Sequence, residues 1–260
     1  MLEIEIKYRP IYWIPFIRKV KSNVPQNWSD VTQKQLIAIS NLYKSSISDM
    51  DFLKAMTGLK KGVVSKLSDF EHFKLMEIFA FIGDQKPHHE FIVRKLSVSH
   101  QPVLYAPSPM LKGVTFGQFI FADTYFANYQ QSNDENDLNK FIASLYLGKN
   151  EKFEERLIQE QFESIGKLEL NIRQSIVLNY QLIHEWLALA YPLIFQKQSE
   201  TISNASTDKA SPISDSTSWI KVFQNFVGDD IIHDEVWAAK PVNTIFSYMT
   251  RKYKENARKR

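Results

Sequence analysis

The chain has 260 residues, 44% of them hydrophobic and 13% aromatic, so it can bury a sizeable core and is not globally disordered. It has no cysteine, which excludes disulfides, thiolate nucleophiles, zinc–thiolate sites and iron–sulfur clusters. The formal net charge of +3 is too small to indicate nucleic-acid binding by itself.

The N-terminal residues predict an extended segment. Residues 2–6 alternate apolar and charged side chains, which is typical of a half-buried strand, and this charged start predicts no secretory signal. Residues 8–16 add aromatic side chains and two prolines. This composition suits either an edge strand of the chain's own domain or an arm that docks on a partner. For an arm, the candidate interface residues are Tyr8, Tyr12, Trp13 and Phe16.

Most of the remaining chain predicts helices. Apolar spacing and capping residues place them near residues 32–44, 49–56, 68–82, 115–131, 134–147, 151–165 and 167–191. Residues 87–109 lack a helical period and contain β-branched residues and prolines. We expect two short strands there, at 91–96 and 103–105, within a loop-rich insertion.

The most apolar stretch, residues 176–195, predicts a buried helix rather than a membrane span. It contains polar and helix-breaking residues that would be costly in a bilayer, namely Asn179, Gln181, His184, Glu185 and Pro192.

The C-terminal region begins with a change in composition. Residues 196–218 are rich in Ser, Thr, Asn, Asp and Lys and predict a flexible linker. Beyond them we expect helices at 219–227 and 242–255, and the first contributes two further candidate interface residues, Trp219 and Phe223.

The predicted fold class is mainly α, a helical bundle with a short β-rich N-terminal arm and a small β/loop insertion. The expected parts are an arm (1–27), a helical body (28–195) with its insertion at about 87–109, a linker (196–218) and a C-terminal helical segment with a basic end (219–260).

Asp123 stands out within the helix expected at 115–131. At 100° per residue it falls in the middle of an apolar face formed by Phe116, Phe119, Ile120, Ala122, Phe126 and Ala127. A carboxylate in such a place costs free energy unless it is paired or neutral. We expect a buried aspartate bonded to Arg156, Arg173 or backbone amides, and the alternative is a catalytic or ligand-binding role.

No other pattern indicates catalysis, a metal or a nucleotide. Phosphate-binding loops, dinucleotide fingerprints and nucleophile elbows are absent from the sequence. Residues 88–90 and 233–235 combine histidine with acidic side chains, but their spacing does not place two ligands on one helical face. We therefore expect no cofactor, no metal and no enzymatic activity.

The C-terminal end is basic. Against the single acid Glu255 it carries Arg251, Lys252, Lys254, Arg258, Lys259 and Arg260. This pattern is typical of a solvated helix end that complements the helix dipole. The alternative is a surface that contacts a polyanion or an acidic partner.

Two segments carry a family resemblance. LKGVTFGQFIFADTYF at 111–126 and LNKFIASLY at 138–146 resemble poorly characterised proteins encoded in the structural modules of tailed phages and prophages, and Trp186 and YPLIF at 191–195 fit the same pattern. The order of helical body, linker and small tail is also similar to phage tail-assembly chaperones. The resemblance implies partners among tail-tube, tape-measure or capsid-associated proteins, and it carries no catalytic residues.

We therefore expect a phage assembly or virion-associated protein that acts by protein–protein binding, with tail assembly as its setting. The host cytoplasm and the virion are the expected locations, without membrane contact. Two alternatives stay open: a nucleic-acid-associated module that uses the basic C-terminus, and an enzyme of unrecognised class around Asp123.

Overall fold

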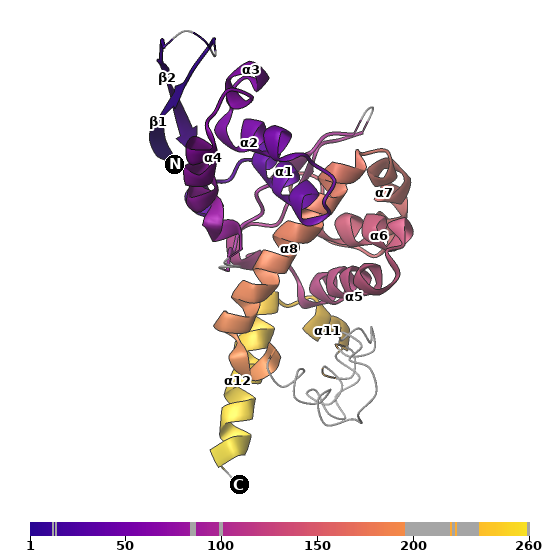
Figure 1. Cartoon of the computed structure of the whole chain (residues 1–260). Helices are drawn as coiled ribbons and strands as arrows, with labels where there is room; N and C mark the ends of the chain where they lie inside the picture. Colours follow the sequence, from indigo (N-terminus) through magenta and orange to yellow (C-terminus); the bar gives the residue numbers. More distant parts are fainter. Residues whose placement is uncertain are drawn as a thin grey trace. The chain divides into compact units, whose positions relative to one another are not determined.

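The computed structural model describes residues 1–11, 13, 15–83, 87–98, 101–195, 219, 222 and 234–258. It confirms a mainly α-helical fold with two small antiparallel sheets (Figure 1). The chain divides into two compact units, Met1–His88 (unit 1) and His89–Arg260 (unit 2). This boundary lies inside the expected helical body and joins the expected N-terminal arm to the first helices. The expected linker at 196–218 lies outside the described residues.

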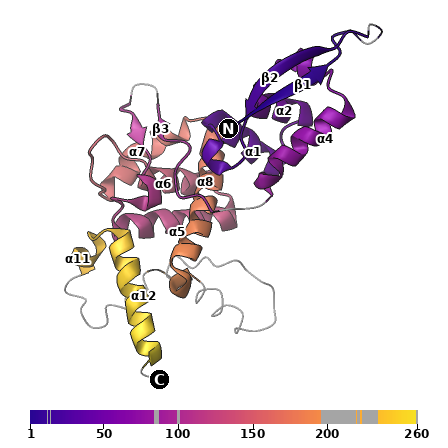
Figure 2. The same cartoon turned by 90° about the vertical axis from the view of Figure 1, so that its left-hand side faces the viewer.

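Unit 1 begins with a β-hairpin. Strand β1 (Leu2–Tyr8) pairs antiparallel with β2 (Arg18–Val24), so that Leu2 lies opposite Val24 and Tyr8 opposite Arg18. Ile6 and Val24 are buried, and the Ser22 hydroxyl donates to the carbonyl of Thr57. The expected extended arm is therefore one half of a hairpin whose inner face packs on the unit's own helices (Figure 2).

The helices of unit 1 enclose a small apolar core. Leu36, Ile39, Phe52, Leu53 and Met56 are almost fully buried in it. The helices are η1 (Trp28–Asp30), α1 (Gln33–Tyr43), α2 (Asp49–Thr57), α3 (Lys61–Val64), α4 (Asp69–Ile78) and η2 (Phe79–Ile82). Gly58, whose φ of 68° suits glycine, ends α2 as the sequence predicts.

Unit 2 is built around α5, α6 and α8. Its helices are η3 (Pro109–Leu111), α5 (Phe116–Ser132), α6 (Glu135–Leu145), α7 (Arg156–Gly166), α8 (Leu170–Ala190), α11 (Asp234–Ala238) and α12 (Val242–Arg258). Helix α6 ends two residues earlier than expected because the backbone of Leu147 pairs with that of Tyr105. Among the described residues, no helix is both long and apolar enough to cross a membrane.

The insertion of unit 2 contains two short paired strands, β3 (Lys95–Leu96) and β4 (Leu104–Tyr105). It is anchored by polar side chains that come from helices. Asn179 of α8 accepts from the Ile92 amide at 2.6 Å and donates to the Glu90 carbonyl at 2.8 Å. The buried Tyr146 hydroxyl donates to the Val93 carbonyl at 2.7 Å. Asn179, a polar residue in an apolar helix, thus fixes a loop.

The C-terminal helices belong to the core of unit 2. Val242, Ile245, Phe246 and Met249 of α12 are buried, and the Phe116 amide at the start of α5 donates to the Lys240 carbonyl at 2.8 Å. The described part of the C-terminal helical segment expected at 219–260 therefore belongs to the same compact unit as α5, α6 and α8. The far end of α12 extends away from the rest of unit 2 (Figures 1 and 2).

Candidate functional site

The turn end of the hairpin exposes a group of large apolar side chains. We call residues 8–18 the hairpin tip. The exposed fractions are 84% for Trp13, 57% for Phe16, 50% for Ile17 and 44% for Ile11. Single exposed apolar residues are common, but several within one turn indicate a binding surface. Of the other candidates there, Tyr8 is partly buried at the end of β1, and Tyr12 lies outside the described residues.

Acidic side chains occur on β1 of the hairpin but not at its turn end. Along the two strands, Lys19 pairs with Glu5 and Lys21 with Glu3, each at 2.8 Å. The hydrogen bond from Lys19 holds the pKa of Glu5 below its usual value. No acidic residue occurs between positions 6 and 29. The turn end therefore keeps an excess of positive charge.

The cations at the hairpin tip, Arg9 and Arg18, and the neighbouring Lys7 on β1 form no ion pair within the part of the chain that the structure describes. The Arg18 guanidinium lies 5.7 Å from the centre of the Phe16 ring, a cation–π contact that orients both side chains. The tip is thus apolar and cationic at once.

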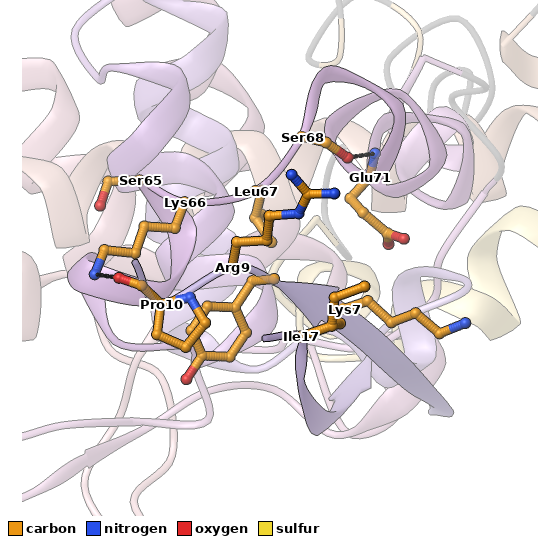
Figure 3. A pocket seen from close by; sticks show the side chains of 10 residues that line it. Lys7, Arg9, Pro10, Ile17, Ser65, Lys66, Leu67, Ser68 and Glu71 are labelled. Atoms are coloured by element: carbon orange, nitrogen blue, oxygen red, sulfur yellow. Dashed lines mark hydrogen bonds between the residues drawn. The ribbon is translucent and has the colours of Figure 1, made fainter. Parts of the chain in front are cut away.

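A cavity of about 610 Å³ lies between the hairpin tip and the turn that joins α3 to α4 (Figure 3). One wall consists of Lys7, Tyr8, Arg9, Pro10 and Ile17, and the other of Ser65, Lys66, Leu67, Ser68 and Glu71. The Lys66 amine donates to the Pro10 carbonyl and so ties the two walls together. The cavity belongs entirely to unit 1.

The polar groups of this cavity favour an anionic group. Arg9 extends from the hairpin toward the first turn of α4, whereas the Lys7 amine points away (Figure 3). Glu71 is the one acidic residue among the described lining residues. A guanidinium can bind a carboxylate through two parallel hydrogen bonds, and the neighbouring Pro10, Ile17 and Leu67 offer apolar contact.

Asp123, the second candidate position, lies in unit 2 and is 8% exposed. The indole N–H of Trp219 donates to its Oδ2 at 2.5 Å, and the Tyr180 hydroxyl donates to its Oδ1 at 3.3 Å. His184 Nε2 lies 2.5 Å from the same Oδ1, although it is not aligned as a hydrogen bond. Burial, with the Asp123 charge as a smaller cause, raises the pKa of Tyr180 well above its usual value.

The prediction that Arg156 or Arg173 pairs with Asp123 is wrong. Arg173 instead donates to Asn139 at 2.8 Å and pairs with Glu135 at 2.9 Å. The exposed Arg156 pairs with Glu160 of α7 and with Glu154, which precedes that helix. Each arginine has nearer acceptors, so the partners of the aspartate are neutral aromatic donors and a histidine.

Trp219 is buried, which corrects its assignment as an interface residue. It is 5% exposed and makes ring contacts with Phe116 and Phe119 of α5, Phe195 after α8, and Phe246 of α12. Together with Asp123 these residues form a socket that holds the indole. Phe223 lies outside the described residues.

The basic C-terminal end is partly compensated within α12. Arg251 lies 3.9 Å and Lys252 3.8 Å from the Glu255 carboxylate. Lys254 and Arg258 are exposed, and Lys259 and Arg260 lie outside the described residues. Among the described residues no cluster of His, Asp or Glu is arranged to hold a metal ion.

Comparison with known proteins gives no match to any family model, curated protein or solved structure. The resemblance to phage structural-module proteins stays a prediction from the sequence.

The cavity and the role of Arg9 were not predicted from the sequence. One pattern points toward them: a run from position 6 to 29 that contains cations and aromatic residues but no acid. The second wall of the cavity could not be inferred, because residues 65–71 meet the hairpin only through the tertiary fold.

Proposed function

We propose that this protein is a phage assembly or virion-associated factor that acts by binding other structural proteins, with tail assembly as its setting. The observation that supports protein binding most directly is the hairpin tip, where Trp13 is 84% exposed beside Phe16, Ile11 and Ile17. Aromatic side chains of this kind dominate the energetics of protein interfaces. The setting rests on the sequence resemblance at 111–126 and 138–146. The host cytoplasm and the virion are the proposed locations.

The anchoring of the hairpin favours this function. The Ser22 hydroxyl donates to the Thr57 carbonyl and the Lys66 amine donates to the Pro10 carbonyl, so the hairpin that carries the tip is held on the helices of its own unit. A preorganised surface loses less conformational entropy on binding than a disordered arm.

Co-expression with the protein products of neighbouring structural genes tests the proposal. The wild-type chain should co-purify with at least one of them, and the double variant Trp13→Ser, Phe16→Ser should lose that partner. Leu189→Ser is the matched control, since Leu189 is 69% exposed on α8 in unit 2. Failure of the wild-type chain to retain any of these products would overturn the proposal, as would equal retention by the double variant.

A further inference from the structure

We infer that the hairpin tip and its cavity bind an acidic, apolar peptide segment of the partner protein, with a carboxylate against Arg9 and apolar side chains against Trp13 and Phe16. This inference rests on the proposed protein-binding function and adds the chemistry of the segment that is bound.

The charge of the surface argues for an acidic ligand. Lys7, Arg9 and Arg18 form no ion pair within the described residues, while the glutamates of the hairpin are engaged by Lys19 and Lys21. A carboxylate that reaches Arg9 therefore meets an unpaired guanidinium at the edge of a cavity. Such charge-assisted, bidentate contacts are stronger than neutral hydrogen bonds.

The shape and lining of the site argue for a peptide. A volume of about 610 Å³ is in the range of sites that enclose several side chains or a small ligand. Its apolar lining includes the aliphatic Ile17 and Leu67 as well as Pro10, and Ile11 is exposed nearby. Aliphatic side chains such as these can pack against leucine or aromatic side chains of a peptide.

The same features disfavour a nucleic acid as the occupant. Bases stack on flat aromatic platforms and their phosphates need a track of several free cations. Here Lys66 is engaged by Pro10, the Arg18 guanidinium lies over Phe16, and the Glu71 carboxylate lines the cavity. A peptide that brings one or two carboxylates is compatible with this pattern.

The probe for the test is a fluorescein-labelled decapeptide that alternates glutamate with leucine and phenylalanine, titrated with the full-length chain and followed by fluorescence anisotropy. The wild-type chain should bind it, and a version with lysine in place of glutamate should not bind. Arg9→Glu should weaken binding of the glutamate peptide by about tenfold or more, as expected for loss of a charge-assisted pair, and should gain binding of the lysine peptide.

Lys34→Glu is the matched control for charge. Lys34 is exposed in the first turn of α1, lies outside the cavity lining, and its replacement suits the helix dipole, so binding should be unchanged. Thermal unfolding of each variant verifies that it is folded. An Arg9→Glu chain that binds the glutamate peptide as the wild type does would overturn the inference.

Two further probes separate other anionic partners. An oligothymidylate, or vesicles of anionic phospholipid, bound more tightly than the glutamate peptide and weakened by Arg9→Glu would reassign the surface and overturn the inference. Co-purification separates its failure from that of the proposed function. If a structural partner is retained by the wild type and by Arg9→Glu but lost from Trp13→Ser, Phe16→Ser, the acidic-peptide inference fails and protein binding stands.

Discussion

At the scale of single residues, Asp123 shows how a buried charge can be held by neutral donors. Its carboxylate accepts from the Trp219 indole and the Tyr180 hydroxyl, with His184 beside it. The Trp219 N–H and the Tyr180 hydroxyl are both buried, and both have this carboxylate as their acceptor. The aspartate therefore satisfies aromatic side chains that would otherwise lose hydrogen bonds on folding.

Asp123→Ala should lower the free energy of unfolding by about 2–4 kcal/mol, because it leaves the Trp219 N–H and the Tyr180 hydroxyl buried without an acceptor. Urea unfolding at neutral pH measures this difference. Glu163→Ala removes a carboxylate from an exposed position of α7 and should change stability by less than about 0.5 kcal/mol. Equal effects of the two substitutions would contradict the role given to Asp123.

Tyr180 makes the free energy of unfolding depend on pH in the alkaline range. Burial raises its pKa well above the usual 10.0, so the folded chain keeps a proton that the unfolded chain releases above about pH 10. The contribution of Tyr180 to the free energy of unfolding is complete at pH values below the pKa of this tyrosine in the unfolded chain. It declines by about 1.4 kcal/mol per pH unit as the pH rises past that value.

The Tyr180→Phe variant should remove this share of the pH dependence. Urea unfolding of both proteins between about pH 9 and 11 measures it. Tyr146→Phe should reduce the slope in the same way, since burial also raises the pKa of Tyr146. Identical slopes for the wild type and both variants would show that these hydroxyls do not stay protonated in the folded chain.

At the scale of elements, Asn179 joins a helix to a loop that has little secondary structure of its own. Asn179→Leu should cost about 2–4 kcal/mol, because the Ile92 amide and the Glu90 carbonyl lose their partners in a site where Asn179 is fully buried. Amide hydrogen exchange should also become faster at Ile92. Gln181→Leu makes a similar change at an exposed position of the same helix and should leave that exchange rate unchanged.

Elements with strong local signals could be predicted from the sequence. The Gly58 end of α2 and the serine and threonine caps of α4 and α5 depend on residues within one turn, and they lie where expected. Gln118 shows the limit of such reasoning. The sequence TFGQ at 115–118 predicts a reciprocal capping box. The backbone amide of Gln118 does donate to the Thr115 hydroxyl, but its side-chain amide donates to the Ser144 carbonyl of α6 instead of bonding back to Thr115.

Elements that depend on distant partners could not be predicted. Strand β2 contains Lys19, Lys21 and Asn23 on one face, and its strand character follows from pairing with β1. The burial of Trp219 depends on rings from α5 and α12 that lie far away in the sequence, so its local sequence predicts an interface position instead. The cavity at the hairpin tip also needs two segments about 55 residues apart.

At the scale of the whole molecule, the chain forms two units with separate cores. Phe52→Ala should destabilise unit 1 by about 3–5 kcal/mol, while amide protection in α6 and α8 of unit 2 stays unchanged. Phe141→Ala in unit 2 should give the reverse pattern. Hydrogen exchange measured by mass spectrometry separates the two outcomes, and loss of protection across both units from either substitution would mean that they unfold together.

Phe195 and Trp219 are in ring contact, with centroids 5.6 Å apart, although residues 196–218 separate them in the sequence. The linker that the sequence predicts at 196–218 would therefore begin and end at neighbouring points of the unit 2 core. For a flexible linker the entropy of closing a loop changes by only about 0.6 kcal/mol when its length doubles, so the sequence prediction implies that this segment tolerates insertions at little cost in stability. We therefore expect that a fluorescent reporter can be inserted there to follow the proposed partner binding, while the hairpin tip in unit 1 keeps its native sequence.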